Sequence, residues 1–209
     1  MGVGVPLPRS FYTVDGCTLA KNCLGKLLVL ETEEGRLSAI ITETEAYMGV
    51  TDRASHAYGG RFTERNRSMY KMGGFSYVYQ IYGLYYCLNL TAAEEGNPEA
   101  VLIRSAIPVE GIECMLKNRQ KKGRAKRYPC SLPLTRKQHE MLLSGPGRLC
   151  TAFGIDKTLD GEDLVAGRLF LEDSGIQVTQ IGAFPRIGID YAGEDRDKPW
   201  RYVAEEYSE

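Results

Sequence analysis

The sequence predicts one α+β domain spanning residues 1–209, with a mainly antiparallel curved β-sheet, flanking helices and a protruding β-hairpin. Two observations support this class. Segments with strand character outnumber helical segments and largely follow one another along the chain, which favours antiparallel pairing. The length of 209 residues fits one large domain better than two, and it is enough to bury a sizeable core.

Two strands joined by a tight turn are expected in the first quarter of the chain. Residues 24–30 and 37–43 are rich in aliphatic side chains, and the segment between them contains a Glu-Glu-Gly sequence typical of a turn. The second strand is expected to continue through Tyr47. Residues 49–76 are rich in glycine, arginine and asparagine, and we expect them to be irregular.

A tyrosine-rich hairpin is expected next. Five of the thirteen tyrosines lie between Ser76 and Cys87, around the single glycine Gly83. Alternating β-branched and aromatic residues interrupted by one glycine predict two strands and a tight turn, with Tyr82 at or beside the tip. An exposed phenol ring there suits stacking on a nucleic-acid base, which is worth roughly 1–3 kcal/mol per base. The alternative is that these tyrosines simply pack the sheet.

The second half of the chain alternates strands and short helices. A strand is expected over 100–106 and is closed by Pro108. Apolar spacing predicts a helix over 109–120. The remaining expected elements are helices over 136–143 and 148–153, separated by Ser-Gly-Pro-Gly, strands over 169–172 and 177–181, and a C-terminal segment.

Composition and targeting signals exclude several classes of protein. No apolar run approaches the roughly 18 residues that span a membrane, and the N-terminus lacks the features of a signal peptide. A cytoplasmic location without membrane contact is therefore expected. The six cysteines form no C-x-x-C pair and there are only two histidines, so we expect reduced thiols, no metal and no cofactor. Nothing in the sequence suggests an oligomer, so a monomer is expected.

Charge is distributed unevenly although the net charge is only −1. Residues 114–139 contain nine basic residues and no acidic one, whereas residues 190–209 contain seven acidic and three basic residues. A basic stretch of this kind can neutralise DNA phosphates, which gives a salt-dependent, sequence-independent affinity. It can equally be a solvated loop, because Gly123, Pro129 and Pro133 interrupt its second half.

Two carboxylates on one strand are the first candidates for chemistry. The alternation of a strand places Glu43 and Glu45 on the same face, about 7 Å apart. That separation is found between the acid and base of inverting glycosidases. It also fits an exposed edge strand on which like charges oppose aggregation.

Two polar residues in apolar surroundings and one histidine are further candidates. Arg104 lies among Val, Leu and Ile, so if buried it needs a carboxylate partner. Asn89 is flanked by leucines and must satisfy its hydrogen bonds. His56 is more often a hydrogen-bonded structural residue than a catalyst.

A set of short motifs runs in order along almost the whole chain. The motifs are Glu43-Thr-Glu45-Ala-Tyr47, Asp52 with His56, Gly59-Gly60-Arg61, Arg65-Asn66-Arg67, Tyr77-Val-Tyr79, Ile81-Tyr82-Gly83, Asn89, Val101-Leu-Ile-Arg104 with Ala106, Pro108-Val-Glu110-Gly111, Ser144-Gly145-Pro146, Arg148-Leu149, Asp163-Leu164, Arg186-Ile-Gly188 and Lys198-Pro199-Trp200-Arg201-Tyr202-Val203. No single motif would be specific, but together they resemble the alkyladenine (3-methyladenine) DNA glycosylase family, in the compact form of a bacterial member.

The resemblance implies a monofunctional glycosylase of base-excision repair that flips alkylated or deaminated purines out of double-stranded DNA and hydrolyses their N-glycosidic bond. Glu45 matches the general base that activates water, and Arg104 matches the arginine that helps to hold that water and carboxylate. No catalytic lysine is implied, so no lyase step is expected. Lesion preference among 3-methyladenine, 7-methylguanine, hypoxanthine and ethenoadenine stays open.

The remaining site residues implied by the resemblance concern recognition. Tyr47, His56 and Tyr79 match the pocket that sandwiches the extruded base, and Leu102 is expected near its floor. Asn89 matches the position that rejects guanine, and Tyr82 matches the residue that fills the vacated stack. Tyr77, Tyr85 and Tyr86 are left to sheet packing. We expect DNA-backbone contacts from Arg61, Arg65, Arg67, Lys121, Lys122, Arg124 and Arg148.

Two alternatives remain from the residues alone. A sugar hydrolase would use Glu43 and Glu45 as acid and base, but such clefts are lined with tryptophan and the single Trp200 lies near the C-terminus. A non-catalytic nucleic-acid-binding module would use tyrosines as stacking platforms and would need neither Glu45 nor Arg104.

Overall fold

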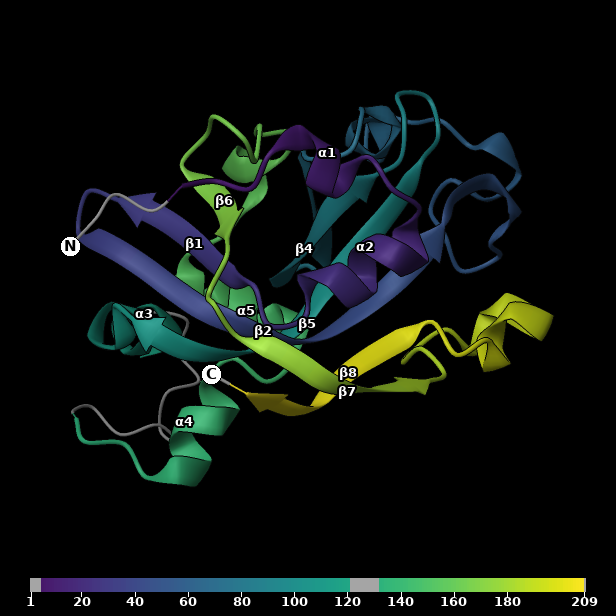
Figure 1. The fold of residues 1–209 in the computed structure, drawn as a ribbon. Helices are drawn as coiled ribbons and strands as arrows, with labels where there is room; N and C mark the ends of the chain where they lie inside the picture. The colour runs from purple at the N-terminus through teal and green to yellow at the C-terminus, as the bar shows by residue number, and fades with distance from the viewer. Residues whose placement is uncertain (1–4, 121–131, 209) are drawn as a thin grey trace.

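A curved antiparallel sheet forms the centre of the protein in the computed structural model, which describes residues 5–120 and 132–208 (Figure 1). Six strands follow the order β3–β4–β5–β2–β1–β6, and β8 pairs with both β2 and β7. All pairs are antiparallel, which confirms the predicted class. The strands are β1 (Leu27–Thr32), β2 (Gly35–Met48), β3 (Ser76–Ile81), β4 (Tyr85–Ala92), β5 (Glu99–Glu110), β6 (Leu169–Glu172), β7 (Gln177–Phe184) and β8 (Arg201–Ser208).

Strand β2 is the longest element and carries both candidate carboxylates. It pairs with β1 over its first half, with β5 along most of its length and with β8 around Glu43–Glu45. The register with β5 shifts on both sides of Glu43, and such irregularities bend a strand and re-aim its side chains. β2 is therefore a central strand, which rules out the alternative of an exposed edge strand at Glu43 and Glu45.

Helices pack on the sheet through short apolar stripes. Asp15 caps the N-terminus of helix α2 (Gly16–Cys23), because its side chain accepts the Thr18 N–H. The buried residues of α2 join the main core together with the aliphatic residues of β1, β2, β4 and β5. In Figure 1, α2 lies across β2 and β5, and the hydroxyl of Thr44 donates to the Ala20 carbonyl at 2.8 Å between these layers.

The predicted tyrosine hairpin is present as β3 and β4. Tyr82 and Gly83 are the central residues of its turn and both have positive φ, at 50° and 65°, as a type I′ turn requires. Glycine meets this requirement without strain, whereas a tyrosine at positive φ is uncommon. The turn thus places the Tyr82 ring at the tip and leaves it 89 % exposed.

Strand β5 is longer than predicted because it continues through Pro108. That proline pairs with Ala39 next to a register shift, so its missing N–H falls at a bulge, where a strand tolerates proline. Gly111 then turns the chain with φ of 73°. Helix α3 (Ile112–Arg119) therefore starts three residues later than the expected position 109.

The later elements match the prediction apart from their ends. Helix α4 (Arg136–Leu142) opens with a capping box between Thr135 and Gln138. Helix α5 (Pro146–Phe153) begins two residues early, because proline fits the first turn of a helix. The C-terminal segment, for which no structure was predicted, forms β8. The short helices are α1 (Arg9–Tyr12) and the 3₁₀ turns η1 (Gly49–Thr51), η2 (Tyr58–Gly60), η3 (Arg67–Tyr70), η6 (Lys157–Leu159) and η7 (Asp190–Asp197).

The segment between β7 and β8 folds back over the end of β2. It includes η7 and lies at the far end of the β7–β8 hairpin in Figure 1.

Among residues 5–120 and 132–208, no helix is long and apolar enough to cross a membrane.

Candidate active site

Glu45 lies on β2 with its side chain fully buried and held by three neighbours. Its Oε1 accepts the backbone N–H of Ile187 at 2.8 Å and lies 3.2 Å from Arg104 Nη1. Its Oε2 accepts the hydroxyl of Tyr47 at 3.0 Å. These partners come from β5, from the β7–β8 connection and from β2 itself, so three parts of the fold fix one carboxylate.

Burial sets the protonation of this carboxylate. Loss of solvation raises the pKa of Glu45 above its ordinary value, and the charge of Arg104, the Ile187 N–H, the Tyr47 hydroxyl and the charge of Arg186 oppose that rise. A carboxylate with a raised pKa is a stronger base once it is ionised. Such a pKa is typical of a general base or acid in an enzyme.

Glu43 shares Arg104 with Glu45. Arg104 Nε lies 3.3 Å from Glu43 Oε1, and the other Glu43 oxygen accepts the Ser105 hydroxyl at 3.0 Å. Arg201, on β8, donates to Glu43 Oε1 at 2.9 Å. The predictions that both carboxylates lie on one face and that Arg104 needs a carboxylate partner are therefore confirmed.

A pocket of about 360 Å³ opens beside this carboxylate, near the lower end of the range for small-ligand sites. Tyr47, Arg104 and Ile187 line it and also contact Glu45, so Glu45 lies directly behind the pocket wall. Further lining residues include His56, Tyr77, Tyr79, Tyr82, Cys87, Asn89, Leu102 and Tyr191. The structure thus brings together all the residues predicted for the base pocket.

His56 and Tyr79 form an aromatic corner of the pocket. Their rings pack edge to face with centroids 4.6 Å apart. Burial, with smaller effects of Arg65 and Arg61, lowers the pKa of His56 to about 4, so the imidazole is neutral near pH 7. Arg65 also lies over the outer side of this corner, 5.4 Å from the Tyr79 ring centre.

Tyr77 was expected only to pack in the sheet, and in the structure it also lines the pocket. The residue is 1 % exposed and packs in the sheet, but its hydroxyl lies 2.7 Å from Nδ1 of His56 and it lines the pocket. A tyrosine two residues before Tyr79 points to the same face of β3, and this period was the signal that could have placed it.

Asn89 and Leu102 form adjacent parts of the pocket. They are direct partners in the β4–β5 register and both are 3 % exposed. The Asn89 amide donates to the Tyr77 carbonyl at 3.1 Å, so its orientation is fixed by β3. The prediction that this amide is satisfied by hydrogen bonding is confirmed.

Tyr82 stands where the pocket meets a larger groove. The groove, of about 1030 Å³, runs between the hairpin and the start of α5, and Tyr82, Tyr85, Tyr86 and Arg148 are among its lining residues. Tyr85 and Tyr86 are half-buried and line this groove, and Tyr86 also packs against the main core, as was expected.

The basic residues predicted to meet the DNA backbone divide into two groups. Arg61, Arg65 and Arg67 are exposed on the irregular segment before β3, and Arg148 is exposed on α5. Arg67 pairs with Glu64 at 3.3 Å, which reduces its free charge. The other three predicted residues, Lys121, Lys122 and Arg124, lie outside the described residues.

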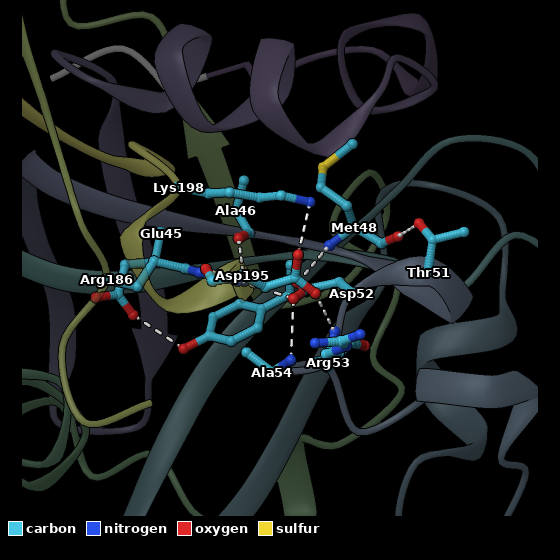
Figure 2. Close-up of polar contacts among 12 residues, drawn as sticks. Glu45, Ala46, Met48, Thr51, Asp52, Arg53, Ala54, Arg186, Asp195 and Lys198 are labelled. Atoms are coloured by element: carbon cyan, nitrogen blue, oxygen red, sulfur yellow. Dashed lines mark hydrogen bonds and ion pairs between the residues drawn. The ribbon is translucent and has the colours of Figure 1, made fainter. Parts of the chain in front are cut away.

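Sequence reasoning missed a buried ion pair beside the site. Asp52 and Arg186 are both fully buried, with Arg186 Nη1 2.5 Å from Asp52 Oδ2, and Ile187 follows directly (Figure 2). Both residues occur in the motifs, but no role was assigned to them. The two charges are separated by 134 residues, and nothing in their local patterns links them.

Comparisons with known proteins agree with this geometry. Residues 10–208 match the family described as methylpurine-DNA glycosylase. The chain is also similar to three proteins that are each provisionally named a 3-methyladenine DNA glycosylase. They are from Desulfitobacterium hafniense (46 % identity, 96 % of this chain and 95 % of the relative), Methanocella arvoryzae (47 %, 94 % and 90 %) and Clostridium novyi (44 %, 94 % and 93 %).

Proposed function

The chain belongs to the methylpurine-DNA glycosylase family and is a DNA-3-methyladenine glycosylase, and we propose that it hydrolyses the N-glycosidic bond of a damaged purine flipped out of duplex DNA. The products are a free base and an abasic site, the first step of base-excision repair. The observation that carries this proposal is a buried carboxylate, Glu45, held at the wall of an aromatic pocket. Membership of this family excludes the sugar-hydrolase alternative.

Glu45 acts in this proposal as the general base. The oxygen of a water attacks C1′, the C1′–N bond breaks with its electron pair going to the base, and Glu45 takes the proton of the water. A carboxylate oxygen accepts about two hydrogen bonds, so Oε2 can hold a water as well as the Tyr47 hydroxyl. The negative charge also stabilises the developing oxocarbenium ion, while Arg104 holds the carboxylate in place.

The aromatic residues Tyr47, His56 and Tyr79 receive the flipped base. Electron-rich rings favour cations by about 0.5–2 kcal/mol, and alkylated purines such as 3-methyladenine carry a positive charge. A neutral His56 supports this preference because an imidazolium would repel the base. Asn89, held by the Tyr77 carbonyl, is the group we assign to rejecting guanine through its exocyclic amine.

Deaminated purines belong to the same proposal but are harder substrates. A cationic lesion leaves as a neutral base, whereas hypoxanthine leaves as an anion unless it is protonated on departure. We therefore expect release of 3-methyladenine, which lacks the exocyclic amine of guanine and leaves as a neutral base, to be faster than release of hypoxanthine or ethenoadenine.

Tyr82 and the exposed arginines bind the duplex. Tyr82 enters the stack vacated by the flipped nucleotide and offsets the cost of unstacking, which is a few kcal/mol. Arg61, Arg65 and Arg148 neutralise phosphates, and Arg67 contributes less because of Glu64. Each phosphate contact steepens the fall of affinity with salt, so replacing Arg148 by alanine should reduce the slope by about one.

The test is base release from duplexes that carry single lesions. The wild-type protein should free the base and leave an abasic site, and Glu45→Gln should lower the rate by roughly 10²–10⁴-fold while lesion binding survives. Unimpaired turnover by Glu45→Gln would refute the assigned mechanism. Binding without base release by the wild type on any lesion would instead favour the non-catalytic module.

A further inference from the structure

Resting on the proposed function, we infer that Arg186, paired with Asp52, is a positioning residue that aims the Ile187 amide at the Glu45 carboxylate. Both side chains of the pair are fully buried, and neither is among the residues that line the base pocket. Their influence on the reaction is transmitted through the backbone of the residue that follows Arg186.

The Arg186 guanidinium ties three segments together. It donates to both Asp52 oxygens, at 2.5 and 2.8 Å, to the Ala46 carbonyl on β2 at 2.9 Å and to the Asp195 carbonyl in η7 at 3.4 Å (Figure 2). The guanidinium also lies over the rings of Tyr47 and Trp200, with its Cζ 4.8 and 4.9 Å from the two ring centres. A planar fork with several donors is the one side chain that can make these contacts together.

Asp52 is fixed on its other side by the turn after β2. Its Oδ2 accepts the Met48 N–H and its Oδ1 accepts the Ala54 N–H, each at 3.0 Å. The neighbouring Arg53 N–H donates to Asp195 Oδ2 at 2.8 Å, so the turn also holds η7 directly. Figure 2 shows these contacts gathered around Asp52 and Asp195.

The Ile187 amide depends on this anchor because the Ile187 side chain does not provide one. That side chain is 52 % exposed, and Gly188 after it has φ of 77°. The buried neighbours are Arg186 on one side and Ile189 on the other, which is 3 % exposed. The direction of the Ile187 N–H, 2.8 Å from Glu45 Oε1, is therefore set mainly by where Arg186 is held.

A purely structural tie would not need this pair. Buried ion pairs are often no more stabilising than well-packed apolar residues of the same volume, because both charges lose their hydration. Nε of Arg186 is also buried without a hydrogen-bond partner among the described residues, which adds to that cost. The guanidinium does, however, back the Tyr47 ring of the base pocket and place a positive charge near Glu45, and an apolar residue does neither.

The charged and titratable groups that face Glu45 determine how the reaction responds to pH. They are Tyr47 on β2, Arg104 on β5 with its second partner Glu43, Cys87 on β4, and Arg186 and Tyr191 from the β7–β8 connection. Loss of Arg186 removes one charge and misdirects one N–H that both hold the pKa of Glu45 down. Glu45 must be ionised to accept a proton. A higher Glu45 pKa should therefore raise the pH below which the enzyme loses activity.

Two substitutions at Arg186 and one control substitution on β2 test the inference by single-turnover base release across pH with enzyme in excess. Arg186→Met should lower the rate constant by about 100-fold, as expected for a misplaced reacting group. It should also move the acid limb of the pH–rate profile, where the rate falls with falling pH, to higher pH. Arg186→Lys keeps the charge but not the fork, so the rate should fall about tenfold and the acid limb should move less than in Arg186→Met. Affinity for a lesion duplex should change little in either variant.

Arg36→Met is the matched control. Arg36 lies on β2, nine residues before Glu45, and forms ion pairs with Glu31, Glu110 and Glu172. Its loss should lower thermal stability without altering the single-turnover rate or the acid limb of the folded protein.

The outcomes are separable. Rates within about twofold of the wild type for both Arg186 variants, with unmoved acid limbs, would overturn the inference. If Arg186→Met does not fold, Arg186→Lys decides, because a wild-type rate with a lysine would show that the fork is not needed. Absence of base release by the wild-type protein in the same assay would instead overturn the proposed function.

Discussion

The floor of the pocket, by which we mean Glu45, the residues that hold it and the partly buried His56, is built in the opposite way to the hairpin tip that carries Tyr82, although both are assigned to one reaction. Glu45 is fully buried and has an arginine, a hydroxyl and a backbone N–H around its two oxygens. Tyr82 is 89 % exposed at a turn with positive φ. A group that must act within a fraction of an ångström is fixed by the protein, whereas a group that must enter a flexible partner is presented on a short turn.

The difference implies that substitutions at the floor should change the rate, and those at the tip should change the affinity. After replacement of Glu45 itself, the largest effect on the rate is expected for Arg104→Met, which removes the guanidinium beside Glu45 and Glu43. We expect the single-turnover rate to fall roughly 10²–10³-fold, as for loss of one preorganised electrostatic partner, with the acid limb at higher pH.

Arg201→Met is the control for Arg104. Arg201 pairs with the same Glu43 oxygen at 2.9 Å and lies opposite Glu45 in the β2–β8 register, but among the described residues its guanidinium forms no ion pair with Glu45. Its replacement should alter the rate much less. Equal losses in the two variants would mean that the Glu43 ion pairs, and not the contact with Glu45, govern the rate.

The next largest effect is expected at the tip. Tyr82→Ala should weaken binding to a lesion duplex by about 5–150-fold, the equivalent of roughly 1–3 kcal/mol of stacking, while the rate at saturating enzyme falls less. Tyr82→Phe keeps the ring and should bind like the wild type. An unchanged affinity for Tyr82→Ala, measured by fluorescence anisotropy, would contradict the wedge role.

The sequence was sufficient for the tip and for most of the floor. The period of a strand placed Glu43 and Glu45 on one face, and the glycine after Tyr82 located the turn, because both signals are local. The ends of β5 and α3 were wrong because a bulge accommodated Pro108, which a local rule treats as a stop.

The residues that hold the floor could not be predicted in the same way. Asp52 and Arg186 look like surface charges in their own segments, and only the fold of the β7–β8 connection over β2 buries them together. The hydrogen bond of the Ile187 N–H to Glu45 is invisible to any side-chain pattern, because a backbone group supplies it. The sheet packing of Tyr77 was predicted, whereas its hydroxyl contact with His56 was not, because the two residues lie 21 positions apart in the sequence.

The floor should also make stability depend on pH in a way that the tip does not. Burial lowers the pKa of His56 to about 4 from its ordinary 6.5, so the folded protein resists protonation that the unfolded chain accepts. This contribution is complete above pH 6.5 and is lost as the pH falls from 6.5 towards 4, by about 2 kcal/mol at pH 5. His56→Gln should flatten the curve of melting temperature against pH in this window.

Tyr82→Ala serves as the control for that curve. Its slope between pH 4 and 6.5 should equal that of the wild type, since Tyr82 has no part in holding His56. An identical slope for His56→Gln and the wild type would mean that another group causes the acid destabilisation.

The smallest expected effect concerns the cost of keeping Glu45 ionised. Its folded pKa is raised above the unfolded value, so the folded state binds the proton more tightly and loses stability as the pH rises through this interval. Glu45→Gln mimics the protonated form, and its amide oxygen can still accept the Ile187 N–H. We therefore expect a melting temperature higher than that of the wild type by a degree or two at pH 8, and no gain below pH 4, measured by calorimetry. A lower melting temperature at pH 8 would mean that the ion pair with Arg104 outweighs the burial of the charge, and the floor would then be stabilised by the same carboxylate that it prepares for catalysis.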